Sequence, residues 1–414
     1  MPPAVYLLAL AVFAQGTSEF MLAGIAPDIA RDLGVSMAST GALTSAFAIG
    51  MVIGAPLMAT VSLRWPRRRA LLAFLLVFMA VHVVGAVTDS FTVLLATRIV
   101  GALANAGFLA VGMATATALV RPDAKGRAIS VLISGVTLAC IAGVPAGAVL
   151  GHLWSWRAAF WAVALVCVPV VIAILRSVPE SAPVPESAPV PERTAADAAV
   201  ATRAEVPSAR RELGELRKVR LLVTLALAAL VNAATFGTFA FLAPAMTDVA
   251  GLGEGGVPVV LALFGIGSFV GVTLSGRMAD SRPLRLLVPG SAALLVGWVL
   301  FALTAGSLPL ALFLVLVQGA LSFAVGATLI TLSVYEAPGA PALGGAFATA
   351  AMNVGAALGP GVAGAAIGAG LGYRAPLWSS AALVATAAVL AGAARAVGRT
   401  RAVARAAETA PPMP

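Results

Sequence analysis

Charged side chains are scarce in this sequence. Asp, Glu, Lys and Arg together make up 10% of the 414 residues, 60% of the residues are hydrophobic, and the mean hydropathy is +1.01. The two cysteines, Cys140 and Cys167, both lie inside apolar runs, so the sequence predicts neither a disulfide framework nor a metal site. A Gly-x-x-x-x-Gly-Lys-Ser/Thr loop and a Ser-His-Asp set are also missing. We therefore expect no ATP hydrolysis, no enzymatic activity and no cofactor.

Apolar runs fill most of the chain, and they are long enough to cross a bilayer, which takes about 20 residues of helix. Ala, Leu, Val and Gly fill them without the apolar–polar alternation of a transmembrane β-barrel. The first run contains Glu19 and has no Lys or Arg before it, so we expect a retained helix rather than a cleaved signal. We predict an all-α membrane protein with twelve transmembrane helices at residues 4–27, 38–63, 70–88, 91–120, 128–151, 158–176, 219–246, 257–276, 284–305, 308–335, 342–369 and 373–395.

A polar, Pro-rich segment interrupts this pattern at residues 177–218. It contains Val-Pro-Glu-Ser-Ala-Pro from Val178 and again from Val184. This composition buries too little apolar surface to fold, so we expect a mobile linker, with a site for a partner that binds PxxP motifs as the alternative. The predicted organisation is a six-helix bundle at 1–176, a cytoplasmic linker at 177–218, a second six-helix bundle at 219–396 and a cytoplasmic tail at 397–414.

The basic residues gather on one side of the predicted membrane. The formal net charge is +9, but no basic face with interleaved aromatics remains once the helices are drawn, so we expect no nucleic-acid binding. Short cytoplasmic loops are enriched in Lys and Arg, and this bias predicts that both termini are cytoplasmic. The inner loops then hold Arg64, Arg67, Arg68, Arg69, Arg121, Lys125, Arg127, Arg277, Arg282 and Arg285, and the outer loops hold Arg31, Arg157 and Arg374.

Two ionisable residues, Glu19 and Arg98, lie inside predicted helices. Insertion of such a residue costs roughly 2.5–3.5 kcal/mol, so transport function is the usual reason for its presence. Glu19 precedes Asp28 by nine residues and Arg98 follows Asp89 by nine residues. At about 1.5 Å per residue, both lie about 13 Å below the outer edge. An ion pair or a water-bridged link is therefore possible, and the structural alternatives are a static buried ion pair or side chains that snorkel to the headgroups.

Each half of the chain carries a basic loop after its second helix, at residues 59–68 and 276–285. Both loops resemble motif A of the major facilitator superfamily, Gly-x-Leu-Ala-Asp-Arg-x-Gly-Arg-Arg, and two six-helix halves fit the parallel repeat of that family. The first loop has Leu63 where the motif has aspartate, which leaves its Arg cluster a topological role. The gating residues that the resemblance implies are Arg64, Arg67, Arg68, Gly276, Asp280 and Arg285.

Two further segments extend this resemblance. Residues 94–105 resemble motif B, whose central arginine, here Arg98, is associated with proton coupling. The core Gly143-Val-Pro145-Ala-Gly147 resembles motif C of drug:proton antiporters. Small residues let helices approach closely and a proline bends a helix, although an ordinary Gly-rich packed helix is the alternative interpretation.

Residues 16–30, which include Glu19, are similar to the first helix of the chloramphenicol-exporter branch of these twelve-helix antiporters. The resemblance implies the major facilitator fold, with two six-helix bundles around a central cavity. It also implies that a monomer in the bacterial inner (plasma) membrane exports a small-molecule drug of the chloramphenicol class against proton influx and confers resistance. The expected partners are therefore the drug, protons and the lipid bilayer. Glu19 is the expected proton carrier and Arg98 tunes it, because a guanidinium does not deprotonate in proteins.

Other side chains inside the helices are weaker candidates for the substrate cavity. The amides are equally well explained as hydrogen-bonding contacts between helices, and the aromatics as packing. His82 is interpreted as a packing histidine rather than a titrating one. The candidates are Gln15, Phe20, Phe47, Asn105, Phe108, Asn232, Phe236 and Asn353.

Two other functions compete with drug export. A sugar or metabolite exporter of the same superfamily would have a similar first helix. A membrane receptor or assembly protein that transports nothing would leave the two charges at membrane depth and the six-helix repeat without explanation.

Overall fold

The computed structural model describes residues 2–62, 65–121, 125–178, 214–278, 283–338 and 344–408. Every secondary-structure element in these ranges is a helix, which confirms the predicted all-α class. The first half, called the N half, contains α1 (Pro3–Phe20), α2 (Leu22–Asp32), α3 (Met37–Ser62), α4 (Arg67–Val87), α5 (Phe91–Ala118), α6 (Lys125–Leu138), the π-helix η2 (Ala139–Gly143), α7 (Val144–Leu153) and α8 (Trp156–Ser177).

The second half, called the C half, repeats the pattern after the segment predicted as a linker. Of that segment, the structure describes Ser177, Val178 and residues 214–218, so the linker prediction falls mostly outside the described residues. The C half contains the 3-10 helix η3 (Gly214–Arg217), α11 (Val219–Phe239), α12 (Leu242–Pro244), the π-helix η4 (Ala245–Val249), the 3-10 helix η5 (Glu254–Gly256), α13 (Val257–Met278), α14 (Pro283–Thr304), α15 (Leu308–Glu336), α16 (Gly344–Ala366), the π-helix η6 (Ile367–Leu371) and α17 (Ala375–Glu408).

Eleven stretches of the described chain are long and apolar enough to span a membrane, and α1 with α2 forms a twelfth as a bent pair. The bend between α1 and α2 is 51°. The single helix predicted at 4–27 is therefore two helices that break at Met21, and the second continues to Asp32. This is a correction to the predicted boundary, while the predicted number of spans agrees with the structure.

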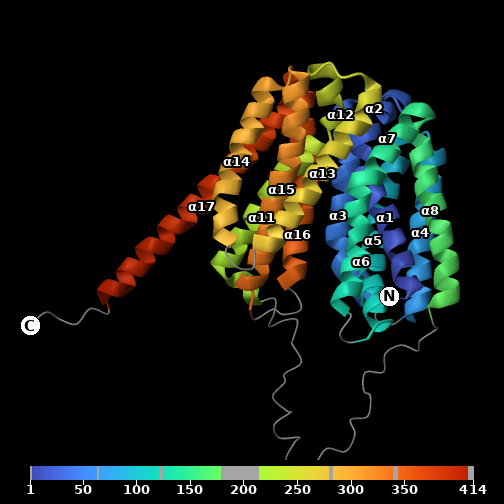
Figure 1. The fold of residues 1–414 in the computed structure, drawn as a ribbon, viewed down its shortest axis with the longest axis horizontal. Helices are drawn as coiled ribbons and strands as arrows, with labels where there is room; N and C mark the ends of the chain where they lie inside the picture. Colours follow the sequence, from blue (N-terminus) through green and yellow to red (C-terminus); the bar gives the residue numbers. More distant parts are fainter. Residues whose placement is uncertain are drawn as a thin grey trace, which may run out of the picture.

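The end of the last helix also differs from the prediction. The boundary predicted at 396/397 falls inside α17, which continues to Glu408. The sequence from 391 to 408 is rich in Ala and Arg, which are strong helix formers, and contains no proline, so its two glycines, Gly392 and Gly398, do not end the helix. Figure 1 shows the end of α17 extending away from the bundle.

The two halves pack as two bundles that lie side by side (Figure 1). One hydrophobic core lies entirely within the N half and is built around Phe78, Phe108 and Phe160. A second core lies mainly in the C half around Trp298 and Phe301. Three N-half residues, Ala23, Val144 and Ala148, join this second core, and Phe20 packs against it, so the two bundles share apolar contacts.

The halves meet at one end of the molecule, which we call the closed end. There α3 lies against α16, and the Ser45 hydroxyl donates to the Ala357 carbonyl at 2.5 Å. A Cβ atom at Gly41 would lie 2.8 Å from the Phe241 ring, so glycine is needed for this approach. On the other side of the interface α13 lies against α7 and η2, where Gly265 packs on the carbonyl of Cys140. Small residues thus bring α3 close to α16, and α13 close to η2 and α7.

The halves separate toward the opposite end, which carries Ser177 and Val219 and which we call the linker end. Gly50 and Gly54 of α3 pack on α5 of their own half, and Gly355 of α16 packs on the Ala229 carbonyl of α11. In Figure 1 the two bundles diverge toward the end at which the N-terminus lies. The described helices therefore form a structure that is closed at one end and splayed at the other.

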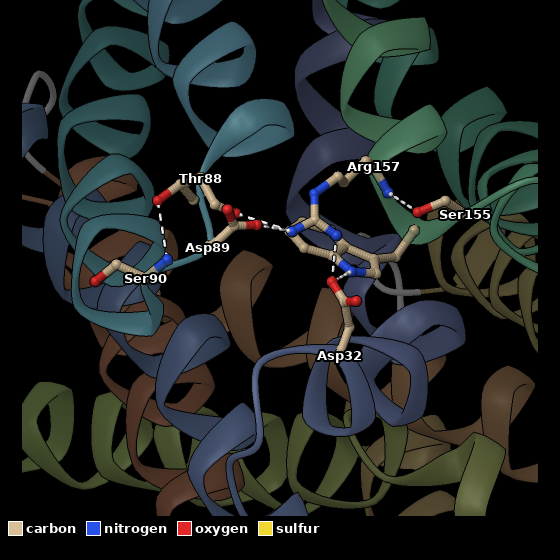
Figure 2. Close-up of polar contacts among 7 residues, drawn as sticks. Asp32, Thr88, Asp89, Ser90, Ser155 and Arg157 are labelled. Carbon is tan, nitrogen blue, oxygen red and sulfur yellow. Dashed lines mark hydrogen bonds and ion pairs between the residues drawn. The ribbon is translucent and has the colours of Figure 1, made fainter.

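A polar clasp holds the N half together at the closed end (Figure 2). The Arg157 guanidinium forms an ion pair with Asp32, a second with Asp89 at 2.6 Å, and a hydrogen bond to the Thr88 carbonyl at 3.1 Å. The indole N–H of Trp156 also donates to Asp32, at 2.9 Å. The clasp therefore joins the end of α2, the loop between α4 and α5, and the start of α8. The sequence identified Arg157 as an outer-loop charge and as part of the Trp156-Arg157-Ala-Ala-Phe160 segment that follows motif C, and it did not predict these contacts.

We expect Arg157→Ala to destabilise the N half by about 1 kcal/mol, a modest amount because Asp32 and Asp89 are 46% and 91% exposed. This corresponds to a fall of roughly 2–4 °C in the thermal unfolding midpoint in detergent. The control is Arg31→Ala, because Arg31 is itself 66% exposed and pairs with Asp28 at 3.3 Å and with the exposed Glu254 at 3.7 Å. Equal midpoints for the two variants would contradict the proposed role of the clasp.

The closed end can be tested by a cysteine pair at positions 38 and 368. A Cβ atom at Gly368 would lie 3.7 Å from the Cβ of Ala38, which is within the range required for a disulfide. In a background without Cys140 and Cys167, we expect Ala38→Cys with Gly368→Cys to crosslink α3 to η6 under mild oxidation. The measurement is the change in gel mobility after cleavage of the 177–218 segment. Failure to crosslink at any oxidant concentration would contradict the closed end.

Candidate functional site

Glu19 lies where span 1, the pair α1 and α2, bends. It is the next-to-last residue of α1 and its side chain is partly exposed. Its carboxylate has no hydrogen-bond or ion-pair partner among the described residues. Glu19 is within Coulombic range of the Arg98 guanidinium, but the two groups form no direct ion pair. The carboxylate is therefore available for a proton or a ligand.

Arg98 of α5 is 2% exposed and has no carboxylate within ion-pair distance in the described ranges. Its Nη1 donates to the Ser18 hydroxyl and its Nη2 to the Ser18 carbonyl, both at 2.9 Å. Its Cζ lies 4.5 Å from the centre of the Phe47 ring, a cation–π distance. Its Nε has no partner in the described structure. A buried cation that no anion neutralises is costly, so the fold retains it for a reason other than stability.

Arg98 and Glu19 are thus linked through Ser18, the residue that precedes Glu19. The predicted common depth of Glu19 and Arg98 in the membrane agrees with this contact, because Arg98 donates to Ser18, the residue next to Glu19 in the chain. The alternative of a static buried ion pair between them does not describe the structure. Attraction between the two charges acts without direct contact, so it changes when either the protonation of Glu19 or the position of α1 changes.

The bend in span 1 has identifiable causes. A helix bends sharply where a proline removes a donor or where a side chain inserts into the backbone ladder. Arg98 donates a hydrogen bond to the Ser18 carbonyl, which lies two residues before α1 ends. Pro27, inside α2, has no backbone N–H and so donates no helical hydrogen bond. The two perturbations flank the break at Met21. The guanidinium and the bend are therefore parts of one arrangement.

His82 of α4 completes this arrangement. Its Nε2 lies 2.6 Å from the Ser18 hydroxyl and its Nδ1 lies 2.6 Å from the Phe78 carbonyl. The side chain is 3% exposed and its ring packs against Phe78 and Phe160. The role of Ser18 was not predictable from the sequence, because a serine inside a helix usually bonds to its own backbone.

The residues of motif C pack against span 1 next to Glu19. A Cβ atom at Gly143 would lie 3.0 Å from the Thr17 Cβ, and one at Gly147 would lie 3.2 Å from the Met21 Cβ. Pro145 is near the start of α7, directly after the π-helix η2. A π-helical segment inside a transmembrane helix frequently marks a functional site. These residues therefore place η2 and α7 directly against the bend.

Aromatic rings connect the two halves beside Glu19. Phe20 stacks on Phe236 of α11, with ring centres 5.5 Å apart and planes at 21°, and meets Phe239 edge-on at 6.4 Å. Phe239 in turn contacts Phe264 of α13 at 4.7 Å. Phe20 and Phe236 are partly exposed. Two of the predicted cavity residues, one from each half, therefore lie together where the halves meet.

The other predicted cavity aromatics are buried within the N half. Phe47 is 2% exposed and faces the Arg98 guanidinium. Phe108 has no exposed surface and belongs to the N-half core. Neither lines an open cavity in this structure, because hydrophobic burial against neighbouring helices covers both rings.

The predicted amides differ in their surroundings. Gln15 and Asn105 are almost fully buried, and both Gln15 side-chain atoms and the Asn105 oxygen have no partner in the described structure. The Asn105 amide contacts the Met51 sulfur at 3.6 Å. Asn232 donates to the Met352 carbonyl at 2.6 Å and so ties α11 to α16, whereas Asn353 bonds within its own helix to Thr349. Asn232 is therefore a contact between helices.

Part of motif A falls outside the described residues, namely Arg64 and Asp280. Arg67 and Arg68 form the first turn of α4, and Arg285 lies in the first turn of α14. Gly276 lies within α13. These described members all lie at the linker end of their helices.

A family model described as Major Facilitator Superfamily matches residues 8–345. A chloramphenicol resistance protein of Streptomyces lividans is 54% identical over 368 residues, which cover 89% of this chain and 90% of that protein. The inner membrane transport protein YdhP of Escherichia coli (strain K12) is 31% identical over 371 residues, which cover 89% of this chain and 90% of that protein.

Solved structures of transporters share the fold. A bacterial homolog of the human lysosomal transporter Spinster, crystallised in an inward-facing and unoccupied conformation, aligns with a TM-score of 0.73 and 19% identity over 95% of this chain and 96% of that chain. A D-xylose–proton symporter aligns with a TM-score of 0.68 and 14% identity over 93% of this chain and 96% of that chain. The protein is a multi-pass membrane transporter of a small molecule rather than an enzyme, and it belongs to the Major Facilitator Superfamily.

Proposed function

We propose that the protein exports a chloramphenicol-like antibiotic across the bacterial plasma membrane in exchange for protons, and so confers resistance. The observation that carries this proposal is the 54% identity to a chloramphenicol resistance protein along nearly the whole length of both chains. The unneutralised Arg98 next to Glu19 supports proton coupling, because a static ion pair would not need this geometry. The protein acts as a monomer embedded in the lipid bilayer.

The direction of export follows from the charge distribution. The excess of basic residues in the loops at the linker end favours a cytoplasmic location for both termini. With this orientation the closed end faces outward and the halves diverge toward the cytoplasm. A drug from the cytoplasm then reaches Glu19, Phe20 and Phe236 where the halves meet, and the two rings provide an apolar surface for an aryl group.

The proposed cycle uses Glu19 as carrier and Arg98 as a fixed cation. When the outer side is open, Glu19 takes a proton, which removes its charge and its attraction to Arg98. After the halves close outside, Glu19 releases the proton to the cytoplasm, and the restored carboxylate is attracted to Arg98 again. Drug binding from the cytoplasm accompanies this release. Arg98 stays charged throughout, because its guanidinium does not deprotonate.

Glu19→Gln tests the carrier. Gln keeps the size of the side chain but cannot ionise, so it cannot take up and release a proton. We therefore expect a sensitive host to lose chloramphenicol resistance to the level of the empty vector. In proteoliposomes, drug uptake driven by a pH gradient is lost while equilibrium drug binding remains. The control is Glu254→Gln, because Glu254 is an exposed acid at the closed end. Undiminished proton-driven transport by Glu19→Gln would refute the carrier role.

The cysteine pair at 38 and 368 tests alternating access. If α3 and η6 must separate to let the drug out, the crosslink traps the closed end and stops export. We expect transport to cease on oxidation and to return on reduction. The single variant Gly368→Cys is the control and retains transport under both conditions. Export that continues at full rate through a quantitatively crosslinked protein would exclude this mechanism.

A further inference from the structure

His82 lies on α4, apart from Glu19 and from the meeting surface of the halves. It is one of two histidines in the chain, and the other, His152, is exposed at the end of α7. Both ring nitrogens of His82 are within hydrogen-bond distance of an oxygen. An apolar ring would pack equally well at this position, so packing does not explain the two short polar contacts of His82.

The hydrogen bonds around Ser18 determine where the protons lie. The Phe78 carbonyl only accepts, so His82 Nδ1 carries a proton and donates to it. Arg98 only donates, so the Ser18 hydroxyl accepts from Nη1. The Ser18 hydrogen then points to His82 Nε2, which accepts it as a neutral imidazole. A second proton on His82 would break this chain and place a cation next to Arg98.

The chain of bonds fixes the guanidinium in two directions. The Ser18 carbonyl alone would let Arg98 rotate about one contact, whereas the hydroxyl adds a second acceptor with a defined orientation. His82 defines that orientation, because it takes the hydroxyl hydrogen and leaves a lone pair for Arg98. His82 is itself held by the backbone of α4 and by Phe160 of α8.

We propose that His82 is a positioning residue for proton coupling: through Ser18 it holds the Arg98 guanidinium against the bend in span 1. In this position the fixed cation contacts Ser18, the residue next to Glu19 in the chain. His82 moves no proton itself. This inference rests on the proposed function, in which Arg98 sets the charge preference of Glu19.

The test compares His82→Leu with His82→Gln. Leu fills the space without a polar atom, and the Gln amide can donate to the Phe78 carbonyl and accept from Ser18 at once. Displacement of a charge by about 1 Å can cost up to a hundredfold in rate. We expect His82→Leu to slow pH-gradient-driven drug transport by about tenfold or more, while equilibrium drug binding and thermal stability stay near those of the unmodified protein. His82→Gln retains most of the transport, as does the control His152→Gln.

A spectroscopic measurement separates positioning from packing. In the His152→Gln background, the protein with ¹⁵N-labelled histidine contains His82 as its one imidazole. We expect a neutral ring with the proton on Nδ1, and Ser18→Ala should shift the Nε2 resonance and leave Nδ1 bonded. A proton on Nε2, or an Nε2 resonance that Ser18→Ala does not move, would overturn the inference.

The two proposals fail in different ways. If the unmodified protein transports drug without any response to a pH gradient, the proposed function fails. If its transport responds to the gradient and His82→Leu transports equally well, the positioning role of His82 fails and the proposed function stands. Equal losses in His82→Leu and His82→Gln would also overturn the positioning role, because hydrogen bonding would then not distinguish them.

Discussion

The burial of the Arg98 guanidinium is the constraint on which the rest of the site depends. A cation of this size in an apolar bundle needs acceptors, and no carboxylate of the described chain comes within ion-pair distance. The carbonyl and hydroxyl of Ser18 and the face of Phe47 supply partial negative charge instead. Because these partners belong to α1 and α3, the charge ties three helices together and holds span 1 in its bent form.

Small residues determine where this arrangement lies relative to the two halves. Gly143 and Gly147 bring η2 and α7 onto the part of α1 that carries Thr17 and Met21, and Gly265 brings α13 onto η2. Glu19 therefore lies at the junction between the bundles rather than inside one of them. A change of charge at such a junction acts directly on the interface, which is the physical link that alternating access needs.

Hydropathy was sufficient to predict the helical class and the spans, because backbone groups in a bilayer must bond within helices or closed barrels. Glu19 and Arg98 were identifiable because ionisable residues are rare at that depth. The contacts of Ser18 and His82 were not, since short polar side chains in helices mostly bond to their own backbone, as Thr17 does to Phe13. The burial of Phe47 and Phe108 and the contacts of the Arg157 clasp depend on how segments distant in the sequence pack together, so the sequence alone did not predict them. The closed end is a property of one conformation of the protein.

The proposed mechanism depends on Glu19 exchanging a proton as the drug binds. The direct measurement is the number of protons released when chloramphenicol is added to the purified protein in weakly buffered detergent solution, followed with a pH indicator. We expect the unmodified protein to release protons in proportion to occupancy, and Glu19→Gln to bind the drug and release none. Proton release of equal size from both proteins would contradict a carrier role for Glu19.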